Sequence, residues 1–377
     1  MDSKYNKAYE EVVNYFSGQL VIPNPDFVDI SYENWVAKDE NLQKLCSPFE
    51  VTKDEASCED ETTQEKSDNS KPDNYYSKIL NLHDHPCELK LIKWITEDRD
   101  HKNKLIKCPK AAKINRHNDI LPYTYNTVYI SHKEKTLSNY INASYICGPF
   151  LEENDNNLFI ATQGPLQQTI FSFWKMVLEH NIYLIIMLSN ITEKGYVKSE
   201  IYWPENSSTP LISKDETSGE EITITLLSSQ EMIEKSMVLR RIKINNDKEV
   251  LQIHITCWPD HSVPFEGKAY EVVSLTLFQI DEYRKSHVTD QAPIVVHCSA
   301  GVGRTGTFIA IYNIIRCLQK LLSIYDPQKN PITPILNVFN VVRKLREQRY
   351  SMVSDTCQYK FIYKFCLDWI RKNFNKQ

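Results

Sequence analysis

Residues 297–305 read HCSAGVGRT, and this stretch decides the fold. It holds a cysteine and an arginine with five residues between them. A short apolar run, 292–296, precedes it, and the apolar residues of 307–322, which follow it, recur at helical spacing. The pattern predicts a buried strand, a tight loop and a helix. The backbone N–H groups of such a loop and the positive end of the helix dipole together form a site for a phosphate dianion.

The same stretch carries reactive groups. The pKa of a cysteine falls at a helix N-terminus and beside a cation, so Cys298 is a candidate thiolate nucleophile. Arg304 supplies a planar fork for two phosphate oxygens. A buried structural cysteine is the alternative, since free cysteine is among the most buried residue types. The full string on a strand, loop and helix outweighs that alternative and predicts attack on a phosphate monoester.

The string resembles the signature loop of protein tyrosine phosphatases. From about 113 to 370 the chain resembles the catalytic domain of the tyrosine-specific members, with further family motifs in family order. The resemblance implies an α/β fold: a single domain with a large twisted mixed β-sheet flanked by helices, and the phosphate-binding loop between a strand and a helix. The motifs are 115–119 (NRHND), 140–146 (YINASYI), 161–165 (ATQGP), 193–195 (EKG) with 202–204 (YWP), 258–261 (WPDH) and 358–361 (QYKF).

The resemblance implies a two-step mechanism. Cys298 attacks phosphorus, and Asp260 protonates the leaving tyrosyl oxygen and later activates the water that hydrolyses the phosphocysteine. Asp260 belongs to a loop that closes over the substrate, with Trp258 in its hinge. Thr305 is expected to hydrogen-bond Cys298, and His297 to hold the loop and lower the pKa of the thiol. A purely structural role is the alternative for both residues.

The resemblance also implies the residues that hold the substrate and the arginine. Asp119 is expected to bind the backbone N–H of the substrate, and Glu193 to orient Arg304 through a bidentate pair. Lys198 is expected to contact the closed acid loop, although a solvated surface lysine is the alternative. The phosphate itself is expected to be bound by loop residues Ser299, Ala300, Gly301, Val302 and Gly303.

Several positions depart from the family pattern. His117 stands where the family has a tyrosine that stacks on the ring of the substrate, so stacking and selectivity are expected to weaken. Ser262 replaces a glycine of the acid loop, which restricts closure if that position needs φ > 0. Ser354 replaces the glutamine that positions the hydrolytic water, whereas the second glutamine, Gln358, is present. These changes predict relaxed or altered function.

Three functions compete. The leading hypothesis is a protein tyrosine phosphatase that hydrolyses phosphotyrosine in proteins through a phosphocysteine. The second is a weakened pseudophosphatase that binds and shields phosphotyrosine proteins. Retention of Cys298, Arg304 and Asp260 together favours the enzyme, because binding alone needs only the arginine and the loop. A phosphoinositide phosphatase is disfavoured, since the variable loop residues carry no lysine or arginine for further phosphates.

Charge and composition divide the chain. Of the net charge of −5 over 377 residues, residues 1–80 carry −9 and the rest +4. A mildly basic catalytic part suits an anionic substrate, but +4 is also an ordinary surface charge. Residues 50–73 hold nine acidic residues and almost no large apolar ones, so they cannot bury a core. We expect an extension at 1–49 that is partly structured or flexible, an acidic disordered linker at 50–80 and a phosphatase domain at 81–374.

The remaining expectations concern environment and partners. Ten cysteines without a CxxC pair indicate reduced thiols. No signal sequence, lipidation motif or apolar run of about 18 residues is visible, which predicts a cytoplasmic signalling protein without integral membrane association. We expect phosphotyrosine-containing proteins as partners, no nucleic acid, no cofactor, no metal and a monomer. The abundance of Asn, Lys, Ile and Tyr indicates an AT-rich genome and favours similarity to the phosphatases of parasitoid-wasp viruses, the bracoviruses.

Overall fold

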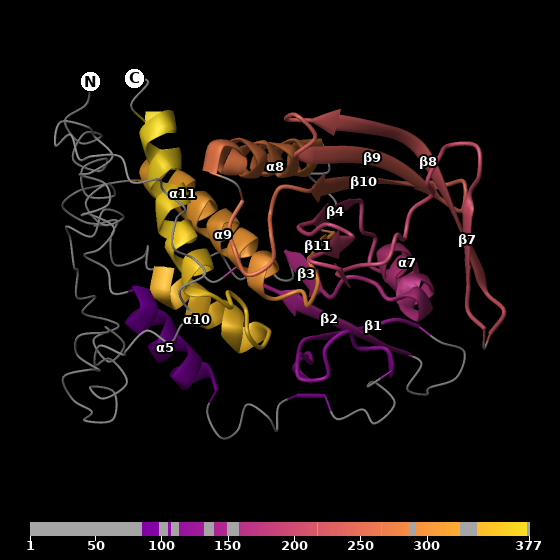
Figure 1. Ribbon diagram of the computed structural model, residues 1–377, viewed down its shortest axis with the longest axis horizontal. Coiled ribbons are helices and arrows are strands. Elements are labelled where there is room, and N and C mark those ends of the chain that lie inside the picture. The colour runs from indigo at the N-terminus through magenta and orange to yellow at the C-terminus, as the bar shows by residue number, and fades with distance from the viewer. Residues whose placement is uncertain are drawn as a thin grey trace. The chain divides into compact units, whose positions relative to one another are not determined.

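The computed structural model describes residues 85–97, 105–106, 113–131, 139–148, 158–216, 218–264, 266–286, 292–324 and 338–374 (Figure 1). The predicted extension at 1–49 and linker at 50–80 lie outside the described residues. The described residues fall into two compact units. The first holds those of 96–309 and 344–354, and the second holds those of 85–95, 310–343 and 355–374.

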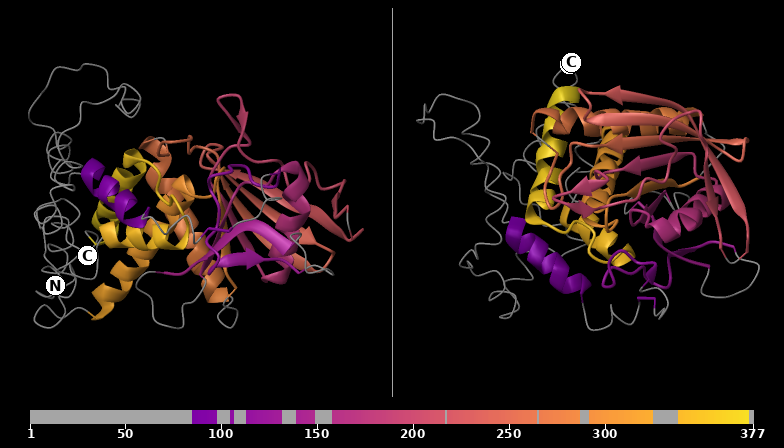
Figure 2. Two further views of the ribbon diagram at one scale, coloured as in Figure 1. Left: turned by 90° about the horizontal axis from the view of Figure 1, so that it is seen from below. Right: turned by 45° about the vertical axis from the view of Figure 1, so that its right-hand side comes forward.

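The first unit is built on a nine-stranded sheet in the order β1-β2-β3-β11-β4-β10-β9-β8-β7 (Figure 1). Its central strands β3, β11, β4 and β10 run parallel, and the outer pairs are antiparallel. Figure 2 shows the strands of this sheet rotated progressively against one another. The predicted mixed sheet is therefore confirmed. The strands are β1 (Thr127–Tyr129), β2 (Tyr140–Ile146), β3 (Phe159–Thr162), β4 (Leu184–Met187), β7 (Leu211–Lys214), β8 (Glu221–Met232), β9 (Met237–Ile244), β10 (Lys248–Ile255) and β11 (Ile294–His297).

The predicted strand, loop and helix are present at the centre of this sheet. The strand expected over 292–296 is β11, and the helix expected over 307–322 is α9 (Gly303–Ile324). Beside the sheet the first unit also holds a two-stranded hairpin, β5 (Thr192–Glu193) and β6 (Tyr196–Val197). Its helices are η5 (Gln167–Thr169), α7 (Ile170–Glu179) and α8 (Glu266–Ser286), and α9 begins in it.

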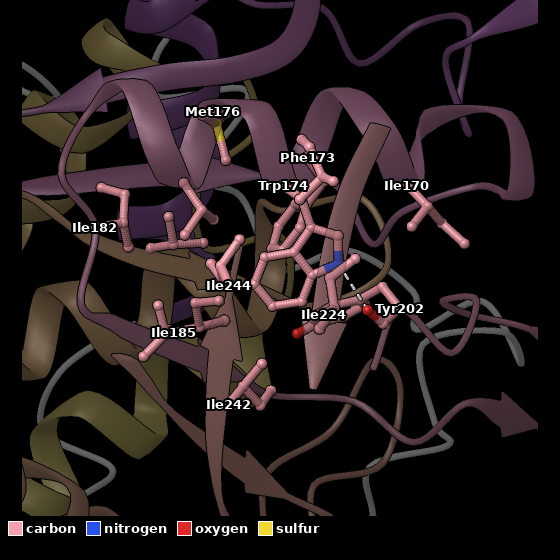
Figure 3. Close-up of a cluster of buried hydrophobic side chains, with 14 of the residues drawn as sticks. Ile170, Phe173, Trp174, Met176, Ile182, Ile185, Tyr202, Ile224, Ile242 and Ile244 are labelled. Carbon is pink, nitrogen blue, oxygen red and sulfur yellow. Dashed lines mark hydrogen bonds between the residues drawn. The ribbon is translucent and has the colours of Figure 1, made fainter. Parts of the chain in front are cut away.

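Helix α7 packs its apolar side chains against the sheet, as Figure 3 shows. Phe173 and Trp174 lie with Ile185 of β4, Ile224 of β8 and Ile242 of β9 in one cluster of buried residues. The sequence of α7, IFSFWKMVLE, is apolar almost all round, which is typical of a buried helix. The Trp174 Nε1–H donates to the carbonyl of Tyr202 at 2.7 Å, so the indole is buried without an unpaired donor.

The second unit is helical. Its elements are α5 (His85–Thr96), the rest of α9, most of α10 (Val338–Gln348) and α11 (Thr356–Phe374). The hydroxyls of Tyr359 and Tyr363 on α11 donate to one carboxylate oxygen of Glu88 on α5, at 2.6 and 3.2 Å. The ring of His85 lies edge-to-face on Tyr363, with 4.8 Å between centroids. These contacts join the first and last described helices of the chain.

The cysteines do not all follow the expectation from sequence. Among the described residues, five cysteines have free thiols: Cys147, Cys257, Cys298, Cys317 and Cys366. Cys357, on α11, is disulfide-bonded. The expectation of reduced thiols alone is therefore wrong at Cys357, because spacing along the chain does not show which cysteines the fold brings together.

The core contact of α7 gives a test of the fold. Replacing Trp174 by alanine removes a fully buried ring and leaves the Tyr202 carbonyl without its donor. We expect Trp174→Ala to lower the free energy of unfolding by about 3–5 kcal/mol in chemical denaturation. Phe278→Ala on α8, where the ring is 54% exposed, is the control and should change it by less than about 0.5 kcal/mol. Equal losses in the two variants would contradict the packing described.

Candidate active site

Two glycines allow the loop between β11 and α9 to pack against the end of β3. Gly301 has φ of +73°, and a Cβ there would lie 2.1 Å from the carbonyl oxygen of Thr162. A Cβ on Gly164 would lie 2.7 Å from the carbonyl oxygen of Cys298. Both distances are impossible for a real side chain, so only glycine fits at either position. The N–H of Gly164 donates to the Ser299 carbonyl at 2.8 Å and closes this contact.

Arg349, which the sequence analysis missed, holds the loop from behind. Its guanidinium donates to the carbonyls of Gly301 and Ala300 at 2.9 and 3.2 Å, and to side-chain oxygens of Asn142 and Ser144. Complete burial lowers the pKa of Arg349 to about 10, which still leaves it charged at pH 7. In a trans peptide the N–H points away from the carbonyl. The peptide N–H groups that follow these two carbonyls therefore point away from Arg349.

Cys298 lies at the start of this loop, with 3% of its surface exposed. The Thr305 hydroxyl donates to the Cys298 sulfur at 3.3 Å. A donor at that distance stabilises negative charge on sulfur. The structure thus places Thr305 where the resemblance implies it.

His297 is buried under the loop and bonded at both ring nitrogens. Its Nδ1 lies 3.2 Å from the Cys298 carbonyl, and its Nε2 lies 2.7 Å from the Tyr202 hydroxyl. Burial lowers the pKa of His297 to about 3, so the imidazole is neutral at pH 7. The partners assign Nδ1–H as donor to Cys298 and Nε2 as acceptor from Tyr202. His297 therefore acts on the loop through hydrogen bonds and not through a charge.

The Tyr202 hydroxyl is itself fixed from the sheet. The side-chain amide of Gln252 on β10 donates to it at 2.7 Å, and Arg240 on β9 donates to the Gln252 side-chain oxygen at 3.0 Å. Burial raises the pKa of Tyr202, which keeps the phenol protonated as the donor to His297. A chain of hydrogen bonds thus runs from β9 to the carbonyl of Cys298. The sequence motif at 202–204 contains Tyr202 but does not indicate this role.

Arg304 of the phosphate loop forms hydrogen bonds with two other segments, the β5–β6 hairpin and the acid loop. One terminal nitrogen, Nη1, donates to Glu193 Oε1 at 2.6 Å and to the Trp258 carbonyl at 2.7 Å. The other, Nη2, donates to Asp260 Oδ1 at 3.0 Å. Glu193 uses one oxygen only, and its Oε2 has no hydrogen-bond partner among the described residues. The pair is therefore not bidentate as expected.

Asp260, the candidate general acid, is surrounded by cations. Lys198 Nζ makes a short ion pair with it, Arg304 makes the contact described above, and His261 Nε2 lies 4.0 Å from Oδ2. Burial alone would raise the pKa of Asp260. The contacts with Lys198, Arg304 and His261 outweigh burial and hold its pKa below the ordinary value. In this arrangement the carboxyl is ionised, and the acid loop rests on the arginine of the phosphate loop.

The backbone conformation of the acid loop shows whether position 262 needs a glycine. The left-handed φ of this turn, +50°, falls on His261, and Ser262 is not among the described residues with positive φ. Its carbonyl accepts a hydrogen bond from Trp258 Nε1 at 2.8 Å. A serine is therefore compatible with the loop in this conformation, and the restriction expected from a missing glycine does not apply to it.

The recognition segment is tied to the site through Arg116. Its guanidinium donates to the carbonyls of Gly164, Pro165 and Val197 at 3.1, 2.8 and 2.9 Å. His117 and Asp119 follow it, and both are exposed. Burial of part of the ring lowers the pKa of His117, and the electrostatic influences on it include Asp119, Lys198 and Asp260. His117 therefore lies within electrostatic reach of the candidate acid.

The two positions of the glutamine loop fall in different units. Ser354 belongs to the first unit, and its hydroxyl donates to the Ser351 carbonyl at 3.3 Å within its own turn. Gln358 belongs to the second unit, on α11, with 2% of its surface exposed. Its contact with substrate stays a prediction.

Among the described residues no group of three or more His, Cys, Asp or Glu side chains could hold a metal ion.

Comparison with known proteins gives one family. The sequence model of the family described as protein-tyrosine phosphatase matches residues 111–368. Receptor-type tyrosine-protein phosphatase eta of Mus musculus is 35% identical over 260 residues, which are 68% of this chain and 19% of that protein. Tyrosine-protein phosphatase non-receptor type 20 of Homo sapiens is 34% identical over 272 residues, 70% of this chain and 56% of that protein. The chain thus spans about a fifth of the receptor-type relative.

Solved structures with a similar fold also belong to protein tyrosine phosphatases. The catalytic domain of human protein tyrosine phosphatase non-receptor type 18 superposes with a TM-score of 0.62 at 28% identity, covering 76% of this chain and 96% of that one. The same phosphatase in complex with HER2-pY1196 phosphopeptides gives a TM-score of 0.63 at 27% identity, covering 76% and 93%. The viral source that composition favoured stays a prediction.

The cations around Asp260 give a test of the site electrostatics. Lys198→Met removes a charge that lowers the pKa of Asp260, so we expect the Asp260 carboxyl to titrate at higher pH in the variant. Carboxylate NMR, with the signal assigned through Asp260→Asn, measures this directly. Lys194→Met, on the same hairpin and exposed, is the matched control and should leave the titration in place. A downward shift in Lys198→Met would contradict the ion pair.

Proposed function

The chain belongs to the protein-tyrosine phosphatase family, and on that premise we propose that it hydrolyses phosphotyrosine in proteins through a phosphocysteine intermediate. The observation that carries the proposal is the gathering of three reactive groups at one loop. Cys298 receives a hydrogen bond from Thr305, and Arg304 in the same loop binds Asp260. Nucleophile, anion clamp and general acid are the parts that the reaction needs.

In the first step the Cys298 thiolate forms a bond to phosphorus, and the bond from phosphorus to the tyrosyl oxygen breaks. Asp260 gives its proton to that oxygen, so tyrosine leaves as a neutral phenol. The phosphate dianion is bound by Arg304 and by the loop N–H groups that point away from Arg349. Phosphate oxygens then compete with Asp260 for Arg304, which frees the acid to face the leaving group.

In the second step water attacks the phosphocysteine, and the Asp260 carboxylate takes a proton from it. Inorganic phosphate forms, and Cys298 leaves as a thiolate. The Thr305 hydroxyl, 3.3 Å from the sulfur, stabilises the charge that returns to it. His297 holds the Cys298 carbonyl through both steps by a neutral hydrogen bond. No step in this sequence uses a metal ion.

One observation favours a second candidate, a protein that binds phosphotyrosine but turns it over slowly. The Ser354 hydroxyl is directed to the carbonyl of Ser351 in its own turn. Serine is also shorter than the glutamine that the family uses to position water. Binding and the first step depend on other residues, so only hydrolysis of the phosphocysteine is weakened under this alternative.

The finer assignments belong to the proposal. We propose residues 81–374 as the phosphatase domain, supported by a family match over 111–368 that spans both compact units. The structure of the non-receptor type 18 phosphatase with phosphopeptides supports phosphotyrosine segments of proteins as partners. No described helix combines the length and apolar character needed to cross a membrane. A monomer in cytoplasmic signalling stays a proposal.

Turnover of a phosphotyrosine peptide and of p-nitrophenyl phosphate tests the function. We expect both substrates to be hydrolysed by the full chain, Cys298→Ser to abolish turnover, and Asp260→Ala to lower kcat by about 10²–10⁴-fold while it still binds the peptide. Phe278→Ala, on the exposed face of α8, is the control and should keep the wild-type rate. Wild-type rates in Cys298→Ser would reject the mechanism, and absence of turnover with intact peptide binding would favour the shielding protein.

The position of Ser354 predicts which step is slow. Misplacement of a reacting water by about 1 Å costs on the order of 10²-fold, so the phosphocysteine should accumulate. Rapid mixing should then show a burst of nitrophenol close to one equivalent of enzyme. Ser354→Gln should shrink the burst and raise kcat, whereas Ser207→Gln, at an exposed position, should change neither. A missing burst together with no gain in Ser354→Gln would show that another residue already positions the water.

A further inference from the structure

The β5–β6 hairpin beside the active site has a fixed register. Its two turn residues, Lys194 and Gly195, have φ of +49° and +81°. Two positive φ values define the tight two-residue turn that matches the twist of a hairpin. Glu193 is therefore opposite Tyr196, and Thr192 is opposite Val197.

This register decides which side of the hairpin Tyr196 occupies. Residues directly opposite in an antiparallel pair project from the same face, so Tyr196 shares a face with Glu193. Lys198 follows β6 directly, and its N–H donates to the Ile191 carbonyl just before β5, so the pairing of the two segments continues to it. Glu193 pairs with Arg304, and Lys198 pairs with Asp260. The Lys198 ammonium lies 6.0 Å from the centroid of the Tyr196 ring. Tyr196 thus belongs to the face that supports the arginine and the acid.

The ring of Tyr196 is left open to solvent at this place. Its surface is 73% exposed, the largest fraction among the exposed large apolar residues of the described chain. The hairpin itself is anchored, since Arg116 donates to the Val197 carbonyl at 2.9 Å and the Lys198 N–H donates to the Ile191 carbonyl at 2.7 Å. The aromatic ring is therefore exposed on a support tied to the recognition segment.

We propose that Tyr196 is a specificity-determining residue that packs against an apolar side chain flanking the phosphotyrosine of a protein substrate. The proposal rests on the proposed function, because it assigns the substrate of that same site. An aromatic ring gives a large contact area at a low cost in side-chain entropy, and an apolar or aromatic partner covers it best. The two groups of the same face that contact the site, Glu193 and Lys198, are already engaged in ion pairs. The ring of Tyr196, with 73% of the residue exposed, is available for contact with substrate.

The test compares peptides that differ only next to the phosphotyrosine. A set of phosphotyrosine peptides carries alanine or leucine at each of the three positions before and after it. The measured quantity is the ratio of kcat/KM for the leucine peptide to that for the alanine peptide at each position. We expect the wild-type chain to favour leucine by about two- to tenfold at one position or more, and Tyr196→Ala to lose that ratio. Tyr196→Phe should keep it, because the ring makes the contact.

The controls separate this proposal from the proposed function. Tyr129→Ala, which removes a 53% exposed tyrosine on β1, should keep the wild-type ratios. The same ratios measured as peptide affinities in Cys298→Ser test Tyr196 without turnover. Hydrolysis of p-nitrophenyl phosphate by the wild-type chain reports on the function alone. If the leucine preference is missing, or survives in Tyr196→Ala, the specificity role is overturned whether or not the chain turns over phosphate.

Discussion

The buried guanidinium of Arg304 is the group on which the rest of the site depends. Its side chain is almost fully enclosed, and a buried charge is tolerated only when its donors find partners. Burial works against its charge, but Cys298, Glu193 and Asp260 together raise its pKa. The hairpin that bears Glu193 and the loop that bears Asp260 are therefore both placed by an arginine of the phosphate loop. One side chain thus joins the phosphate loop to the Glu193 hairpin and to the acid loop.

Because Asp260 is bound to Arg304, the acid loop and a bound phosphate compete for the same guanidinium in the proposed mechanism. Asp260 occupies Arg304 as an anion, which is the position that a phosphate oxygen takes in the proposed mechanism. In the proposed mechanism a bound dianion would displace the carboxylate and remove one of the contacts that lower its pKa. The pKa of Asp260 would then rise, and the protonated form needed for the first step would become more populated. The proposal thus couples the binding of phosphate to the protonation of the acid through the same guanidinium.

The sequence predicted what depends on local pattern. The run before Cys298 and the spacing after Arg304 gave the strand, the loop and the helix, because a tight anion-binding turn needs those neighbours. Arg349 was missed, since its partner Gly301 lies 48 residues away and no local signal separates a buried arginine from a solvated one just after a helix. Whether Ser262 needs a positive φ stayed open in the sequence, because a turn can carry it on either of two polar residues, and the structure has it at His261.

The departures from the family pattern at 117, 262 and 354 fall on residues that are not buried. The groups that shape the loop, Arg349, His297 and Thr305, are fully buried and hydrogen-bonded. His117 is exposed and Ser354 is half-buried, so both changed positions are accessible to solvent. A change under the loop would leave buried polar groups unpaired and would cost stability. A change at a solvent-accessible position costs little stability. In this chain the residues under the loop are therefore constrained by packing, whereas positions 117 and 354 are not.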